Sequence, residues 1–231
     1  MSHLFSVDFI FFTLFGYSLS YLEFFGTIFY LLSVYLIAKR KVMTWPIGIV
    51  SVLLFMLLFY QIRLYADAAE QVYYLIASIY GWWHWKRSTS EQENGIEVEF
   101  SPIKMILIYL GAIFLLSLIL GLALSHAHEY SSTLFPEPAS YPFVDAFTVM
   151  MSLFAMWLLA CKRTESWIFW IIVDVISIGL YYVKGVVFIS LLYVILLVLA
   201  GDGLLTWMRA SRPASAEIGT GDIAADAKLM E

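Results

Sequence analysis

Long apolar runs separated by short polar stretches dominate this chain. Seven of these runs approach or exceed the roughly 20 residues that a helix needs to cross the hydrocarbon core of a bilayer. They cover residues 21–38, 45–60, 66–85, 103–124, 143–161, 166–183 and 186–207. The pattern predicts an all-α integral membrane protein with seven transmembrane helices that is embedded in the lipid bilayer.

The N-terminal 20 residues form a shorter apolar stretch with a different character. From Leu4 to Ser20 the chain has no basic start and no small-residue cleavage site, so it does not resemble a cleaved signal peptide. Asp8 lies within it. We expect a short peripheral helix over residues 1–20 that lies in the membrane interface, and an eighth span is the alternative.

Basic residues are concentrated in alternate connections between the predicted spans. The first, third, fifth and final connections contain Lys39, Arg40 and Lys41; Lys86 and Arg87; Lys162 and Arg163; and Arg209 and Arg212. Cytoplasmic loops carry the excess of lysine and arginine, so the C-terminus is predicted to be cytoplasmic. The tail over residues 208–231 lacks apolar periodicity and is predicted to be disordered on that side.

Composition supports a membrane protein and argues against several other classes. Hydrophobic residues make up 62% of the 231 residues and charged residues only 13%, a balance that does not fit a water-soluble domain. The sequence has no basic patch, so no nucleic-acid partner is predicted. It has one cysteine, Cys161, and no phosphate loop or nucleophile elbow. We therefore expect no enzyme activity, no cofactor, no metal site and no ATP-driven pump within this chain.

The chain repeats itself with a constant offset of 122 residues. The aligned pairs include Trp45 with Trp167, Gly81 with Gly203, and Trp85 with Trp207. Three spans reverse the side of the membrane, so two units with the same orientation need one linking span. This predicts a 3+1+3 parallel-repeat arrangement: a three-helix repeat over 21–85, a cytoplasmic loop, linking helix and outer loop over 86–142, and a second repeat over 143–207. Parallel repeats are one of the two common transporter plans.

Polar residues inside the predicted spans fall on two helix faces. At about 100° per residue, one face presents Trp167, Trp170, Asp174, Ser177 and Tyr181, and the other presents Asp67, Glu70, Gln71, Tyr74 and Ser78. Charged groups inside a membrane usually face a cavity or a partner, so these faces are candidates to line a path. Tryptophans near span ends are typical of interfacial belts, which is what we predict for Trp45, Trp82, Trp83, Trp85 and Trp207.

Several motifs resemble those of a known family. The first repeat contains Trp45-Pro46-Ile47-Gly48, Leu64-Tyr65-Ala66-Asp67 and Tyr80-Gly81-Trp82, and the second contains Ser166-Trp167-Ile168-Phe169-Trp170. Over about residues 20 to 208 the chain resembles the PnuC nicotinamide riboside transporters. The resemblance implies a SWEET-like fold, a homotrimer, the bacterial inner (cytoplasmic) membrane, and facilitated uptake of nicotinamide riboside that a cytosolic nicotinamide riboside kinase then traps.

The same resemblance implies roles for individual residues. Trp167 and Trp170 would be the tryptophan pair that lines the site, Gln71 a polar contact and Tyr193 the tyrosine of the seventh span. The family pattern has an asparagine three residues before that tyrosine, where this chain has Ser190.

The chemistry of the substrate fits these residues. Nicotinamide riboside carries a pyridinium cation and a carboxamide. Aromatic faces attract the cation, and Gln71 can both donate to and accept from the carboxamide. Asp174 would balance the charge or bind the ribose, and Asp67, Tyr74 and Tyr181 complete the predicted site.

Other functions stay open at this stage. The alternatives are a transporter of another vitamin such as thiamine, a channel, or a structural membrane subunit, and an intramembrane enzyme would have to use Asp67, Glu70 and Asp174. We expect no ion coupling, because no Gly- or Pro-rich helix break marks a cation site. We also expect residues 91–99 and the tail after Arg212 to be dispensable, because neither has periodic apolar surface.

Overall fold

The computed structural model describes residues 6–7, 10–14, 17–89, 96–130 and 140–211. Within these residues the chain forms seven long helices, in the order predicted. They are α1 (Tyr21–Ala38), α2 (Thr44–Gln61), α3 (Tyr65–Thr89), α4 (Ile103–Tyr130), α5 (Pro142–Ala160), α6 (Ser166–Val183) and α7 (Val187–Ala210). The all-α fold class with seven helices is therefore confirmed.

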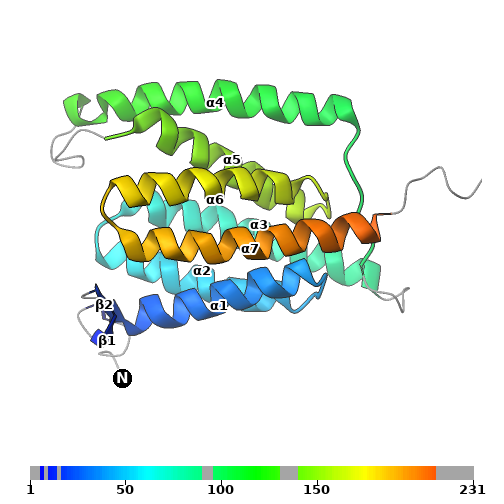
Figure 1. Ribbon diagram of the computed structural model, residues 1–231, viewed down its shortest axis with the longest axis horizontal. Coiled ribbons are helices and arrows are strands. Elements are labelled where there is room, and N and C mark those ends of the chain that lie inside the picture. The colour runs from blue at the N-terminus through cyan, green and yellow to red at the C-terminus, as the bar shows by residue number, and fades with distance from the viewer. Residues whose placement is uncertain (1–5, 8–9, 15–16, 90–95, 131–139, 212–231) are drawn as a thin grey trace, which may run out of the picture.

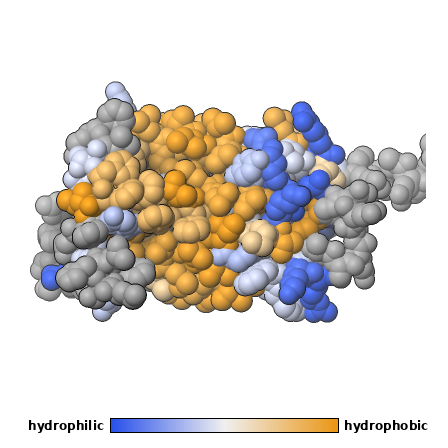
Figure 2. Space-filling model, turned by 90° about the horizontal axis from the view of Figure 1, so that it is seen from below, coloured by the Kyte–Doolittle hydropathy of each residue, from blue (hydrophilic) through white to orange (hydrophobic). Residues whose placement is uncertain are grey.

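Six of the described helices, all except α3, are long and apolar enough to cross a membrane. The exception is the helix that carries the acidic residues Asp67 and Glu70 in addition to Lys86 and Arg87 at its end. Large apolar side chains such as Phe114, Val175 and Val198 are exposed on the outer surfaces of α4, α6 and α7. Figure 2 shows apolar residues covering the middle of the molecule, with hydrophilic residues gathered toward the end where α1 finishes.

The predicted N-terminal helix over residues 1–20 is wrong for the part of this stretch that the structure describes. Strand β1 (Ile10–Leu14) pairs antiparallel with β2 (Tyr17–Ser20). Aromatic and β-branched residues favour strands, and β1 consists of little else. The Phe11 ring lies 4.6 Å from the ring of Tyr21 and 4.8 Å from that of Phe24, so the hairpin packs on the start of α1 (Figure 1).

The start of α1 is fixed by a side-chain cap. The hydroxyl of Ser20 accepts a hydrogen bond from the backbone N–H of Glu23 at 3.2 Å. A serine in this position satisfies one of the N–H groups that the first turn leaves without a partner. The strand therefore ends and the helix begins at residue 21, as the apolar pattern predicted.

The helices form two groups of three. Helices α1, α2 and α3 pack against their neighbours in sequence, and so do α5, α6 and α7. The two groups meet through α1 with α7 and through α3 with α5, while α4 packs mainly on α5 (Figure 1). At the crossing of α4 and α5, the ring of Phe143 lies where a side chain on Gly121 would be, since a Cβ there would be 2.4 Å from it.

Turns that are 122 residues apart in the sequence have the same backbone conformation in the two groups. Arg40 and Lys162, which end the first helix of each group, both have positive φ angles, of 55° and 61°. Arg63 and Gly185, at the next turn of each group, have φ angles of 64° and 77°. The closing hydrogen bonds correspond too: Lys41 N to Leu36 O is 2.9 Å, and Arg163 N to Leu158 O is 2.8 Å. The repeat seen in the sequence is thus present in the geometry of both turns.

Candidate functional site

Polar side chains from four helices of both groups come together inside the membrane region. We call Tyr30 of α1, Glu70 and Tyr74 of α3, Asp174 of α6 and Tyr193 of α7 the polar cluster. The Tyr74 hydroxyl donates to Oε1 of Glu70 at 2.8 Å. Tyr30 lies within electrostatic reach of Glu70, Asp174 and Tyr193. The predicted faces of α3 and α6 therefore do face one space between the two groups of helices.

Asp174 is the most buried member of the polar cluster. Its residue is only 3% exposed, and the described residues offer its carboxylate neither a hydrogen bond nor a lysine or arginine partner. An uncompensated charge in such a place is costly, so a buried acid of this kind indicates a functional site rather than a packing position. Asp174 lies one helical turn from Trp170, as the α6 stripe predicted.

The end of the cluster farther from the basic turns, which the sequence predicts to be the outer end, is lined by aromatic and acidic residues. The rings of Tyr181 and Tyr193 stack with centroids 5.5 Å apart and planes 14° apart. Lys184 forms an ion pair with Asp145 at 3.3 Å and lies 5.9 Å from the Tyr181 ring. Asp67, in the first turn of α3, is within electrostatic reach of both Asp145 and Tyr181. The polar surface thus continues from the turns at this end toward the middle of the helices.

Ser190 and Gln71 occupy different kinds of position. The Ser190 hydroxyl donates to the backbone carbonyl of Ile178 at 2.9 Å, and the residue is 6% exposed, so this side chain ties α7 to α6. Gln71 is half-buried next to Glu70 on α3, and it is the repeat equivalent of Tyr193. The structure records no hydrogen bond between Gln71 and any other described residue.

At the opposite end, four tryptophans form a continuous buried row. The ring centroids of Trp45 and Trp85 are 5.3 Å apart, those of Trp85 and Trp207 are 5.9 Å apart, and those of Trp207 and Trp167 are 5.6 Å apart. All four residues are at most 2% exposed. The predicted belt role is therefore wrong for Trp45, Trp85 and Trp207; Trp82 and Trp83, at 40% and 55% exposed, have the exposure that a belt requires.

Trp85 and Trp207, which are equivalent in the internal repeat, make corresponding hydrogen bonds. Trp85 Nε1 donates to the carbonyl of Ala160 at the end of α5 (3.2 Å), and Trp207 Nε1 donates to that of Ile37 at the end of α1 (3.1 Å). Each central tryptophan therefore bonds to the other group of helices. The row fills the space between the two groups at the end where the basic turns lie.

Glycines make room for the two outer members of the row. A Cβ on Gly81 would lie 2.4 Å from the Trp45 ring, and one on Gly203 would lie 2.7 Å from the Trp167 ring. This accounts for the register of tryptophan and glycine in the repeat. The structure thus places Trp167 in a packing position, with its neighbour Trp170 one turn further into the membrane.

Trp170 occupies the boundary between the row and the polar cluster. It is partly buried and packs against both hydrophobic cores of the molecule. Its indole N–H is buried and finds no acceptor among the described residues. Buried N–H groups usually have a partner, so Trp170 offers both an aromatic face and an unused donor.

The helix-face pattern of the sequence does not include Tyr30, and it gives Glu70 no central place in the predicted site. Tyr30 lies in the middle of α1, away from the interface depths where tyrosines are enriched, and that depth was the available signal. Glu70 was placed on the α3 stripe, but its central position depends on residues from α1, α6 and α7 that no single-helix pattern brings together.

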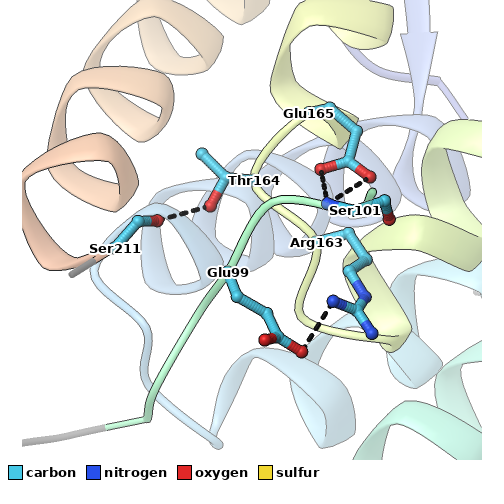
Figure 3. Close-up of polar contacts among 6 residues, drawn as sticks. All are labelled: Glu99, Ser101, Arg163, Thr164, Glu165 and Ser211. Atoms are coloured by element: carbon cyan, nitrogen blue, oxygen red, sulfur yellow. Dashed lines mark hydrogen bonds and ion pairs between the residues drawn. The ribbon is translucent and has the colours of Figure 1, made fainter. Parts of the chain in front are cut away.

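The segment before α4 closes over the basic turns. Glu99 N donates to Lys162 O (3.2 Å), and Thr164 N donates to Glu99 O (2.9 Å). Ser101 N donates to the buried Glu165 carboxylate, as Figure 3 shows. Glu99 and Arg163 form an ion pair at 2.6 Å. The expectation that residues 91–99 lack a packing surface is wrong for the described part, because Ile96 and Val98 are 1% and 5% exposed.

One further ion pair joins the two groups at this end. Lys39, which follows α1, donates to Oδ2 of Asp202 in α7 at 2.8 Å. The hydrogen bond to Asp202 raises the pKa of the Lys39 ammonium. Both side chains are more than a third exposed, so the ion pair contributes little to the stability of the fold.

Comparisons with known proteins agree on one family. A family model described as nicotinamide mononucleotide transporter matches residues 20–209. A nicotinamide riboside transporter PnuC from Escherichia coli is 32% identical over 212 residues, which cover 85% of this chain and 89% of that protein. A riboflavin/roseoflavin transporter RibM from Streptomyces davaonensis is 26% identical over 202 residues, covering 87% of this chain and 91% of the relative.

The fold is also similar to a solved structure. A crystal structure titled as that of the vitamin B3 transporter PnuC superposes with a TM-score of 0.61 and 22% identity. The match covers 82% of this chain and 81% of the other. At this identity the likeness supports the helical architecture alone.

Proposed function

We infer that this chain, which belongs to the nicotinamide mononucleotide transporter family, is a membrane carrier that takes up nicotinamide riboside across a bacterial inner membrane. The observation that carries this proposal is the polar cluster. It combines aromatic rings with carboxylates between two groups of membrane helices, and its buried Asp174 has no basic partner among the described residues. A permanent organic cation is the ligand that such a surface favours.

Transport by alternating access follows from the contrast between the two ends of the interface. The tryptophan row fills one end, whereas polar side chains line the other. If the two parallel repeats rock against each other, the row opens as the outer polar surface closes. The exchange needs only rearranged packing, so we propose facilitated uptake without ion or ATP coupling.

Charge favours the nucleoside over the mononucleotide. The phosphate of nicotinamide mononucleotide adds about 1.5 to 2 negative charges near pH 7, and on the way inward it would meet Asp67, Glu70 and Asp174. Lys184 at the outer end is already paired with Asp145. Like charges in a low-dielectric path repel strongly, so the phosphorylated form is expected to be excluded.

Each predicted site residue has a proposed role that fits its place. Trp170 would stack on the pyridinium ring and donate its free N–H, while Gln71 would pair with the carboxamide. Asp174 and Tyr193 would face the ribose or the charge, with Tyr74, Tyr181 and Asp67 nearer the outer end. We propose Trp167 as part of the floor beneath the ring, and Ser190 as a positioning residue for α6 and α7.

Assembly and cellular context are proposed from the family. We propose a homotrimer with the C-terminus in the cytoplasm and a cytosolic nicotinamide riboside kinase that consumes the product, so that uptake runs downhill. No catalytic step is assigned to this chain.

The direct test is binding to purified protein in detergent. Isothermal titration should give saturable binding of nicotinamide riboside, and no binding of nicotinamide mononucleotide at the same concentration. Thiamine and riboflavin are measured in parallel. Tighter binding of either vitamin than of nicotinamide riboside would contradict the proposed substrate, and uptake into vesicles that does not saturate would point to a channel.

A further inference from the structure

Glu70 is surrounded by tyrosines from four different helices. Tyr30 of α1, Tyr74 of α3, Tyr181 of α6 and Tyr193 of α7 all lie within electrostatic reach of its carboxylate. Tyr74 donates to it directly at 2.8 Å, and Tyr181 and Tyr193 are stacked. We call this arrangement the tyrosine cage.

A second buried carboxylate, that of Asp174, is further evidence that the tyrosine cage binds a cationic ligand. Asp174, nine-tenths or more buried, is within electrostatic reach of two cage members, Tyr30 and Tyr193. The ion pairs among the described residues involve other acids: Lys39 pairs with Asp202, Arg163 with Glu99, and Lys184 with Asp145. Within the described residues, the protein therefore places two acids near a set of aromatic rings, and neither acid has a lysine or arginine partner.

The cage lies nearer the outer end than Trp170 does. Tyr181 follows Trp170 by 11 residues on α6, which is about 16 Å along a helix axis. Asp174 lies between them, about 6 Å from the level of Trp170. A ligand that enters from the outer end would reach the cage before it reaches Trp170.

We propose that Glu70 and the tyrosine cage form a cation-selecting station on the outer part of the substrate path, where an organic cation is chosen over neutral and anionic molecules. Aromatic faces attract a cation through their quadrupole, and the carboxylate balances its charge in a place where water does so poorly. The inference rests on the proposed function, and it adds that Glu70 and the tyrosine cage make binding depend on the charge of the substrate.

The test compares two ligands that differ in charge but share the ribose and the carboxamide. Nicotinamide riboside is a cation, and dihydronicotinamide riboside is neutral. Wild-type protein should bind the cation at least about tenfold more tightly. Glu70→Gln should weaken the binding of nicotinamide riboside by about tenfold or more. It should change the affinity for the neutral ligand by less than twofold. Glu129→Gln, which removes an exposed carboxylate from the outer end of α4, is the matched control and should change neither affinity.

Other results of these binding measurements would contradict the proposed station. Equal binding of the two ligands by wild type, or an equal loss of both in Glu70→Gln, would overturn the proposal. If Glu70→Gln does not fold, Tyr181→Leu should still lower the preference for the cation by about threefold, and an unchanged preference would overturn it. If wild type binds neither ligand, the proposed function is wrong, and the station is then judged by whether thiamine binding, as a second organic cation, is weakened by Glu70→Gln.

Discussion

The two ends of the interface between the helix groups differ in how they use the internal repeat. At the basic end, equivalent positions carry the same residue: Trp45 and Trp167, Gly81 and Gly203, Trp85 and Trp207. Around the polar cluster, equivalent positions differ: Glu70 matches Leu192, Gln71 matches Tyr193, Tyr74 matches Leu196 and Asp174 matches Val52. The matched tryptophans and glycines build the tryptophan row, in which Trp85 and Trp207 meet across the interface, whereas mismatched positions form the polar cluster.

The difference has a physical reason. Closing one end of a two-fold interface requires complementary shapes from both halves, which two copies of one packing unit provide. An asymmetric small molecule presents different groups to the two halves, so its contacts cannot be the same on both sides. In this molecule the preserved tryptophan and glycine pairs mark packing, and the differing residues of the polar cluster mark the candidate site.

The largest expected effect concerns the centre of the tryptophan row. Trp85→Ala removes a fully buried ring and its hydrogen bond to Ala160, so we expect a loss of about 3 to 5 kcal/mol in the free energy of unfolding. Trp83→Ala, two residues away and 55% exposed, should cost less than about 0.5 kcal/mol. Denaturant unfolding in detergent measures both. Similar stabilities for the two variants would mean that the row is not a packing core.

The glycines beneath the row should show a smaller effect of the same origin. Gly203→Ala places a methyl group 2.7 Å from the Trp167 ring, and overpacking of this kind costs about 1 to 3 kcal/mol. Gly201→Ala is the control on the same helix, because a Cβ there would meet no atom within 4 Å. It should be neutral or slightly stabilising. Thermal unfolding of the two variants gives the comparison, and equal midpoints would contradict the packing.

Changes in the polar region should weaken the binding of nicotinamide riboside. Trp170→Ala should weaken nicotinamide riboside binding by about 5- to 30-fold, equivalent to 1 to 2 kcal/mol for the loss of an aromatic face over a cation. Gln71→Ala should cost about 1 to 3 kcal/mol by leaving a desolvated carboxamide unpaired. Trp82→Ala, at an exposed belt position, serves as the control. Wild-type affinity in both site variants, measured by calorimetry, would remove them from the site.

The ion pair at the basic end should give the smallest effect. Lys39 and Asp202 are partly exposed, so a double-mutant cycle with Lys39→Met and Asp202→Asn should give a coupling energy of about 1 kcal/mol or less. Raising the salt concentration should reduce it further. A coupling of several kcal/mol would show that this pair, and not the tryptophan row, holds the two groups together.

Much of the fold could be predicted from the sequence. The apolar runs gave the seven helices, because a helix that must cross a bilayer leaves a run of fixed length. The hairpin before α1 was missed because a stretch of only 20 residues with mixed aromatic and β-branched residues fits either structure.

The candidate site could be predicted in part. The sequence singles out Asp174, Tyr74 and Trp170 because polar groups within an apolar helix are costly and therefore conspicuous, and their role in binding stays a prediction. Trp85 and Trp207 were misassigned as belts, since the belt rule uses depth in the membrane and does not say which way a side chain faces. Their exact register with Gly81 and Gly203 contained the missing information, because glycine opposite tryptophan indicates close packing. Tyr30 could not be placed without knowing that α1 lies against α7.

Above all, we propose that substrate binds where the residues of the two repeats differ and not at the matched tryptophans. A cryo-electron microscopy structure of the protein with nicotinamide riboside tests this most directly. We expect density for the ligand between the two helix groups, with its ring at Trp170 or within the tyrosine cage and its charge near Asp174 or Glu70. Density among Trp45, Trp85, Trp167 and Trp207, or on the lipid-facing side of either group, would contradict the claim.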